Sequence, residues 1–194
     1  EKLGSFAGQL TDQPITGVVI EYAGDVSEMN TRALTSAALA GVLQPMLGVV
    51  NMVSAPVVAR ERGIKVDDVR QSQRGAYETY IRLTVKTEEM ERSVAGTVFS
   101  DGKPRIIQIK GIDLEAEFGQ HMLYITNEDK PGFIGALGML LGNAQVNIAT
   151  FNLGRKSQGG EAICLVQIDE PTPASVLHAL SKLPQVKQAK PLAF

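Results

Sequence analysis

The residue types best suited to bind a small ligand gather at one corner of the chain, between Asn127 and Leu137. A short apolar, β-prone run at 122–126 precedes the corner, Pro131-Gly132 turns the chain, and apolar residues then recur at helical spacing from Phe133. This pattern predicts a strand, a tight turn and a helix. The first amides of a helix lack intrahelical partners and carry partial positive charge, so the start of this helix favours a bound anion.

Side chains near this corner add acceptors for a positive charge. Asp129 supplies a carboxylate, and Asn127 and Asn147 supply carboxamides. A buried ammonium needs acceptors and a buried carboxylate needs donors, because each unpaired group costs about 1–3 kcal/mol. The corner therefore predicts a site for an amino-acid zwitterion. Two simpler interpretations stay open: Pro131-Gly132 is a plain turn, and Asn147 bonds only the backbone of its own turn.

Gly135 and Gly138 interrupt the predicted helix on the side away from its apolar stripe. Each costs about 1 kcal/mol relative to alanine inside a helix. Close approach of a ligand or of another backbone would explain the two glycines, and neutral drift is the alternative.

The remaining reactive residues do not form a catalytic or metal-binding pattern. Cys164 lies in an apolar run and is predicted to be a packed core thiol. His121 and His178 have no nucleophile or acid at an interpretable spacing, and two distant histidines with one cysteine do not suggest zinc. We therefore predict no catalytic residue and no metal ligand.

Composition narrows the possible partners. The chain has 194 residues, 44% of them hydrophobic and 21% charged, which suits two small globular domains. A net charge of -2 and a pI near 5.8 provide no basic field, so we expect no nucleic-acid or membrane partner. A single cysteine fits a reducing compartment, and we predict a cytoplasmic protein. Because the chain starts at Glu1 without a methionine, we expect it to be part of a longer protein.

The first part of the chain predicts a mixed α/β domain whose strands come late. We expect helices at 1–10, at 27–43 with Ser27 or Asn30 as cap and Pro45 as stop, and at 56–62. Residues 66–75 are polar and predict a loop. Strands are expected at 15–23, 77–85, 93–99 and 105–110, the last two joined by a hairpin turn.

The second part predicts a compact β-α-β-β-α-β order. Strands are expected at 121–126, 146–153, 161–168 and 186–192, with helices at 132–143 and from Thr172-Pro173, where Thr172 is the predicted cap. This order usually gives one antiparallel sheet with both helices on one face. The acidic segment 112–120 is the predicted boundary, giving domains 1–119 and 120–194. The fold class is therefore α+β: a mixed α/β N-terminal domain followed by a βαββαβ ferredoxin-like domain.

The sequences of several motifs resemble those of known families. Asn127-x-Asp129-Lys130-Pro131-Gly132-Phe133-Ile134, followed by Val146-Asn147-Ile148, resembles the ACT domain, a regulatory fold that binds amino acids. Upstream, the runs at 50–56, 59–64 and 106–111 resemble the intervening domain of D-3-phosphoglycerate dehydrogenases. The sequence has no G-x-G-x-x-G motif for binding a dinucleotide. The resemblance therefore implies that the NAD site and the catalytic residues of such an enzyme lie outside this chain. We expect no cofactor in the chain itself.

The resemblance also implies a regulatory role. In this family two ACT domains join their sheets side by side, and L-serine binds at the interface for feedback control. Carried onto this sequence, Asn127, Asp129 and Gly132 would hold L-serine or a similar small amino acid, Phe133 and Ile134 would contribute amides, and Asn147 would reach across from a second copy. The implied partners are this ligand, a second copy of the chain and the catalytic domains of the parent protein.

A second anion site is implied in the intervening domain of some family members. Lys103 and Arg105 are the matching basic residues here, but Glu115 stands where another basic residue is expected. Three alternatives to a regulatory part of a dehydrogenase stay open. They are a regulatory piece of an iron–sulfur L-serine dehydratase, a stand-alone amino-acid-binding module, and a free-standing enzyme, for which the chain offers no catalytic motif.

Overall fold

The protein folds into two compact units. The computed structural model describes residues 1–72 and 76–194. The units are Glu1–Lys110 and Gly111–Phe194. The sequence placed the domain boundary after residue 119, whereas the contacts divide the chain after Lys110, because the strand that follows Lys110 packs with strands of the second unit.

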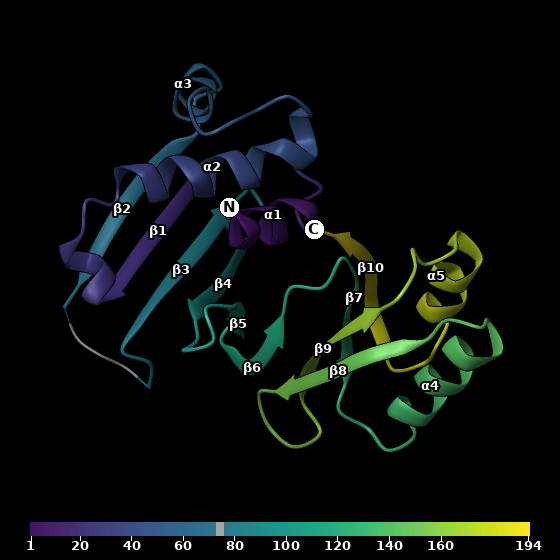
Figure 1. Ribbon diagram of the computed structural model, residues 1–194. Helices are drawn as coiled ribbons and strands as arrows, with labels where there is room; N and C mark the ends of the chain where they lie inside the picture. Colours follow the sequence, from purple (N-terminus) through teal and green to yellow (C-terminus); the bar gives the residue numbers. More distant parts are fainter. Residues whose placement is uncertain (73–75) are drawn as a thin grey trace. The chain divides into compact units, whose positions relative to one another are not determined.

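Within its described residues, the first unit is a mixed sheet with three α-helices (Figure 1). Its strands lie in the order β2-β1-β3-β4-β5, with β1 and β2 parallel and the other neighbours antiparallel. The helical elements are α1 (Lys2–Gln9), η1 (Asp25–Glu28), α2 (Arg32–Leu47) and α3 (Ala55–Glu61). The strands are β1 (Gly17–Gly24), β2 (Lys65–Gln71), β3 (Thr79–Lys86), β4 (Glu91–Val98) and β5 (Pro104–Ile109).

Helices α1 and α2 pack with their backbones almost in contact. A Cβ added at Gly4 would lie 2.2 Å from the Ala38 carbonyl oxygen, and one at Gly8 would lie 2.4 Å from that of Val42. Side chains larger than hydrogen would force the helices apart, because the facing atoms belong to the backbone and cannot rotate away. Glycine is therefore required at this crossing.

The predicted loop at 66–75 is wrong over most of its length. Strand β2 occupies Lys65–Gln71 and pairs in parallel with β1. Its polar sequence is tolerated because the strand lies at the edge of the sheet and most of its residues are exposed. Residues 73–75, the end of the predicted loop, lie outside the described residues.

The predicted long helix at 27–43 differs at both ends. Ser27 lies in the separate turn η1, and α2 begins at Arg32, whose amide donates to Asn30 Oδ1 at 3.2 Å. Pro45 does not end the helix, which continues to Leu47. Proline has a helical φ and removes one intrahelical hydrogen bond, so Pro45 weakens the helix without preventing its last turn.

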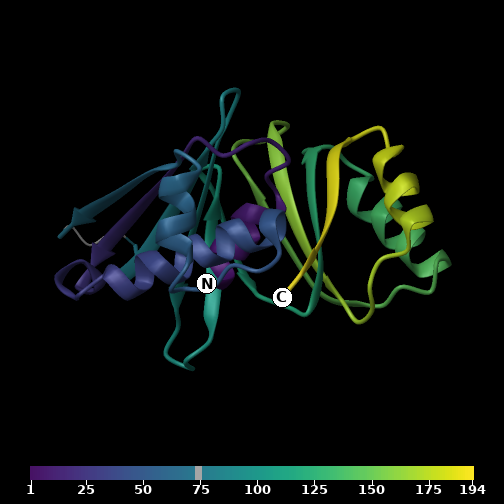
Figure 2. The same ribbon diagram turned by 90° about the horizontal axis from the view of Figure 1, so that it is seen from above.

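The second unit contains the predicted β-α-β-β-α-β order. Its elements are β6 (Ile112–Glu117), β7 (His121–Glu128), α4 (Phe133–Asn143), β8 (Ile148–Arg155), β9 (Glu161–Ile168), α5 (Ala174–Ser181) and β10 (Val186–Ala193). Strands β10-β7-β9-β8 form an antiparallel sheet in that order. Figure 2 shows α4 and α5 on the same face of this sheet.

Strand β6 lies in the segment that the sequence predicted as a boundary. Its apolar residues Ile112, Leu114 and Ala116 are buried and alternate with acidic ones. It packs beside β8, where a Cβ added at Gly154 would lie 2.3 Å from the Asp113 carbonyl oxygen. The strict alternation is the sequence signal for this strand.

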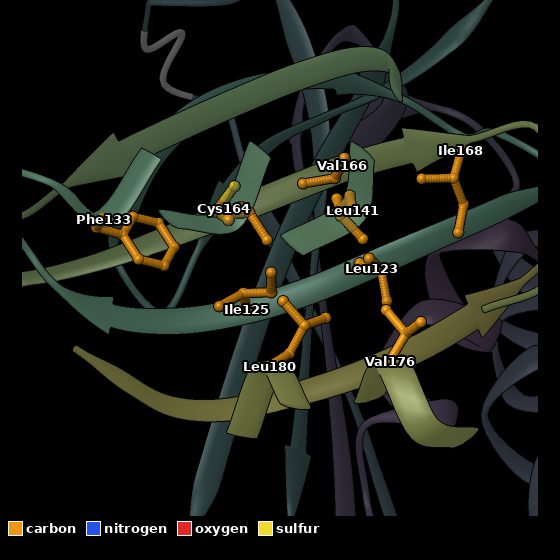
Figure 3. Close-up of a cluster of buried hydrophobic side chains, with 10 residues drawn as sticks. Leu123, Ile125, Phe133, Leu141, Cys164, Val166, Ile168, Val176 and Leu180 are labelled. Atoms are coloured by element: carbon orange, nitrogen blue, oxygen red, sulfur yellow. The ribbon is translucent and has the colours of Figure 1, made fainter. Parts of the chain in front are cut away.

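The core of the second unit lies between its sheet and its helices (Figure 3). The sheet contributes Leu123, Ile125, Cys164, Val166 and Ile168, and the helices contribute Phe133, Leu137, Leu141, Val176 and Leu180. Helix α5 begins after Pro173, and the predicted cap Thr172 is wrong: its Oγ1 is buried without a hydrogen-bond partner among the described residues.

Cys164 is expected to be inert in the folded protein. It is fully buried in this core, and burial raises the pKa of its thiol to about 12. Near pH 8 the reactive thiolate is then about three orders of magnitude scarcer than in an exposed cysteine with a pKa of about 8.5. Reaction with a thiol reagent at pH 8 should be slow until denaturant is added; labelling of the native protein at the rate of a free thiol would contradict the buried placement.

Candidate functional site

The predicted ligand corner lies between β7 and α4. Strand β7 ends at Glu128, and α4 starts at Phe133 after Gly132, whose φ of +91° is readily adopted only by glycine. A Cβ added at Gly132 would meet no atom within 4 Å, so the requirement for glycine is conformational and leaves the corner open. The sequence pattern of strand, turn and helix is confirmed here.

Asp129 ties this corner to the turn between β8 and β9. Its Oδ2 accepts hydrogen bonds from Arg155 Nη1 at 2.7 Å and from the Gly159 amide at 3.1 Å, and its own amide donates to the Gly160 carbonyl at 2.9 Å. The hydrogen bond from Arg155, followed by that from Gly159, lowers the pKa of Asp129 below its ordinary value. Asp129 is therefore an anion at neutral pH.

A pocket of about 380 Å³ opens at the corner. Asp129, Arg155 and the start of α4 line it, so a carboxylate, a guanidinium and a helix N-terminus meet in one place. The amides of Ile134 and Gly135, which also line the pocket, have no hydrogen-bond partner within the described part of the chain. The pocket thus offers donors for an anion and an acceptor for a cation.

The other corner residues divide between the pocket wall and the core. Phe133, the first residue of α4, has its side chain buried in the core, and its amide lies 3.5 Å from the Lys130 carbonyl oxygen. The Ile134 side chain is 57% exposed. Asn127 is buried at the end of β7; its Nδ2 donates to the Glu128 carbonyl at 3.0 Å, and its Oδ1 has no partner among the described residues. A buried acceptor of this kind is stabilised by a donor from a ligand.

Asn147 lies at the opposite end of the sheet. It precedes β8, and its Nδ2 donates to Asp169 Oδ2 at 2.7 Å. Residue Ile148 pairs with Ile168 while Arg155 pairs with Ala162, so the length of β8, roughly 24 Å at 3.4 Å per residue, separates Asn147 from the corner. One copy of the chain therefore brings Asn127, Asp129 and Gly132 together but not Asn147.

The sequence analysis missed Arg155 as a residue of the pocket. Arg155 falls between the strands predicted at 146–153 and 161–168, yet the register places it beside the corner: Arg155 and Asn127 both pair with Ala162, from opposite sides. Lys130 and Gln158 also line the pocket. The sequence does show a cation at the end of β8. Its place beside the corner follows only when the strand order is known, because β9 lies between β8 and β7.

The two basic residues of the predicted second anion site lie in the β4–β5 hairpin. Arg105 donates to both carboxylate oxygens of Asp101, at 3.0 and 2.7 Å, and stacks over the Phe99 ring. The hydrogen bond from Arg105 lowers the pKa of Asp101 to about 2. These contacts brace the hairpin. An anion at Lys103 and Arg105 stays a prediction, and a ligand would have to compete with Asp101 for Arg105.

The sheet of the second unit has two edges of different character. Strand β10 carries Lys187, Lys190 and Pro191, residues that discourage pairing with another strand. Strand β8 carries neither lysine nor proline along Ile148–Arg155. The β8 edge is therefore the one suited to pair with a further strand.

Two further features were sought among the described residues: a metal site and a membrane-spanning helix. Across residues 1–72 and 76–194 no group of three His, Cys, Asp or Glu side chains is placed to hold a metal ion. Within the same residues no helix is both long enough and apolar enough to cross a membrane.

Comparisons with known proteins agree with the division into two domains. Residues 1–110 match the family model of the D-3-phosphoglycerate dehydrogenase intervening domain, and residues 121–185 match that of the ACT domain. The D-3-phosphoglycerate dehydrogenase of Bacillus subtilis is 33% identical over 190 residues, which are 97% of this chain and 36% of that protein. The Synechocystis enzyme is 33% identical over 191 residues, 97% of this chain and 34% of that protein.

A solved ACT domain from the GTP pyrophosphokinase of Chlorobium tepidum covers 42% of this chain, with 21% identity and a TM-score of 0.32. The two D-3-phosphoglycerate dehydrogenases are much longer than this chain, which spans about a third of the length of these curated relatives. Since the intervening-domain model accounts for more than half of the 194 residues and an ACT domain follows it, the chain belongs to the family of the D-3-phosphoglycerate dehydrogenase intervening domain and carries an ACT domain.

Proposed function

We propose that the second unit binds L-serine, or a similar small amino acid, and regulates the longer enzyme to which the chain belongs. The observation that carries the proposal is the pocket at the ACT corner, where the Asp129 carboxylate lies together with the amides of Ile134 and Gly135, which have no partner among the described residues. An α-ammonium would bind Asp129, and an α-carboxylate would bind the amides at the start of α4. The buried Asn127 Oδ1 is a further acceptor at the same end of β7.

The site is completed by a second copy of the chain. Two copies that pair their β8 edges in antiparallel fashion about a twofold axis would run in opposite directions, so the start of one β8 would lie beside the end of the other. Asn147 of the second copy would then approach the corner that holds Asp129 and Arg155. This arrangement uses the edge without lysine or proline and explains why one chain separates Asn147 from the rest of the site.

The parent protein is proposed to be an NAD-dependent D-3-phosphoglycerate dehydrogenase, controlled by the end product of L-serine biosynthesis. NAD binding and catalysis belong to the part of such an enzyme that this chain does not contain, since the sequence has no G-x-G-x-x-G motif. Bound L-serine would restrain closure of the catalytic domains, and the coupling would be reciprocal. A cytoplasmic location is proposed from the single, buried, unpaired cysteine.

Isothermal titration calorimetry of the chain with L-serine, glycine and L-alanine tests the ligand, and light scattering with and without L-serine tests the assembly. We expect saturable binding of L-serine at one site per chain and a dimer or larger oligomer. The absence of heat with all three amino acids would contradict the proposal, and binding by a strict monomer would contradict the shared site.

A lysine in the middle of β8 is expected to separate the copies. Thr150 is exposed on this edge strand, and Thr150→Lys would place two cations near the twofold axis. We expect a monomer by light scattering and at least a tenfold weaker affinity for L-serine, on the order of the loss of one or two hydrogen bonds.

The matched control is Gln188→Lys, which adds the same charge to β10, the edge that already carries two lysines. It should leave both the assembly and the affinity unchanged. If Thr150→Lys stays dimeric, the copies do not pair through β8.

A further inference from the structure

The guanidinium of Arg155 has no role in the binding scheme above, although it lines the pocket. We propose that Arg155 is the side chain that binds the effector's α-carboxylate, and that Arg155 and Asp129 pair with each other until a zwitterion pairs with both. This inference rests on the proposed amino-acid site and adds a specificity residue to it. The ligand class it names is a zwitterion, as opposed to an amine or an acid alone.

The ion pair leaves most of both groups available. Only Arg155 Nη1 and Asp129 Oδ2 form it, at 2.7 Å, and the Gly159 amide donates to the same oxygen. Asp129 Oδ1 and the remaining N–H groups of Arg155 have no hydrogen-bond partner in the described part of the chain. The Arg155 side chain is 53% exposed, so it can turn towards a ligand without leaving a buried cavity.

When a zwitterion separates Asp129 from Arg155, each of the two side chains gains a new partner of opposite charge. The α-ammonium of an amino acid would take Asp129 from Arg155, and the α-carboxylate would take Arg155 from Asp129, so that two ion pairs replace one. A guanidinium binds a carboxylate through two parallel N–H donors, a geometry that its present single contact does not use. An amine without a carboxylate would displace Arg155 and leave it unpaired, and an acid without an amine would do the same to Asp129.

Lys130 is the competing cation, since it also lines the pocket. Its Nζ pairs with Glu128 Oε2 at 2.5 Å, and both side chains are more exposed than Asp129. A lysine ammonium is a compact, strongly hydrated charge without the two-pronged geometry that fits a carboxylate. Arg155 Nη1 also lies 2.7 Å from Asp129 Oδ2, the ammonium acceptor, whereas Lys130 pairs with Glu128. Because the ammonium and the carboxylate of an amino acid are close together, this position favours Arg155 as the carboxylate ligand.

The test is calorimetry of the whole 194-residue chain with L-serine, ethanolamine, which lacks the carboxylate, and glycerate, which lacks the ammonium. Wild-type protein should prefer L-serine to both analogues by at least 30-fold. Arg155→Gln should weaken L-serine at least 30-fold without weakening ethanolamine, which no longer has to displace Arg155 from Asp129. Lys156→Gln removes the same charge from the next residue of the turn and should change neither affinity.

Unchanged L-serine affinity in Arg155→Gln would overturn the inference, and a loss in Lys130→Gln beside it would assign the carboxylate to Lys130 instead. If Arg155→Gln does not fold, as judged by circular dichroism, wild-type protein labelled with ¹⁵N-arginine gives the answer. The Arg155 Nε–Hε signal should shift on addition of L-serine and of glycerate, and an unshifted signal at saturating L-serine excludes the contact. Wild-type protein that binds none of the three compounds would instead defeat the proposed function itself.

Discussion

Replacing Asp129 with asparagine is expected to lower the affinity for L-serine on the order of 100-fold. The substitution keeps the shape of the side chain but removes the only carboxylate among the described residues that line the pocket. It withdraws the acceptor of the ligand's ammonium and leaves only the contacts of the ligand's carboxylate, including that to Arg155. Removing one partner of a charged, hydrogen-bonded pair commonly costs this much in binding, where each tenfold is about 1.4 kcal/mol. Calorimetry with L-serine measures the loss.

The pKa of Asp129 makes the wild-type affinity insensitive to mild acid. Because Arg155 and Gly159 stabilise the ionised form, the folded-state pKa lies below the ordinary value, and the carboxylate stays charged until the pH falls beneath it. L-serine affinity should be constant between about pH 5 and pH 8 and should fall only at lower pH. Arg155→Gln should raise the pKa of Asp129, which ¹³C NMR titration of the carboxyl carbon detects.

The control for Asp129→Asn is Glu61→Gln, which removes the same charge from an exposed residue of the first unit. It should bind L-serine as the wild-type protein does. Equal affinity in Asp129→Asn and Glu61→Gln would mean that Asp129 does not contact the ligand.

The corner itself was predictable because its structure is encoded locally. Gly132 adopts a positive φ and Pro131 precedes it, so the stop of β7 and the start of α4 follow from a few adjacent residues. The continuous apolar runs within β7 and β9 likewise predicted the strands observed. Short-range chemistry of this kind can be read from one sequence.

The missed features depend on partners distant in the chain. Strand β2 is polar and shows no alternation, and only its parallel pairing with β1, which is more than 40 residues earlier in sequence, makes it a strand. Arg155 became part of the pocket through the register of β7, β9 and β8. Asn147 lies a whole strand length from the corner, and its proposed role requires a second copy that no property of one chain supplies.

Substitution of Gly8 by alanine is expected to destabilise the first unit by about 1–3 kcal/mol. A methyl group there would lie 2.4 Å from the Val42 carbonyl oxygen, well inside the closest approach of such atoms. Helix α1 cannot easily shift, because Arg92 of β4 donates to the Leu10 carbonyl at its C-terminal end. The clash therefore outweighs the gain of about 1 kcal/mol that alanine brings to a helix.

Gly138→Ala is the matched control, since it makes the same change in α4 where a Cβ meets no atom within 4 Å. It should stabilise the second unit by about 1 kcal/mol through helix propensity alone. Urea denaturation followed by hydrogen exchange of peptides from each unit separates the two effects. If Gly8→Ala raises the denaturation midpoint of the first unit as Gly138→Ala does that of the second, the close approach of α1 and α2 does not constrain the fold, and these glycines are tolerated rather than required.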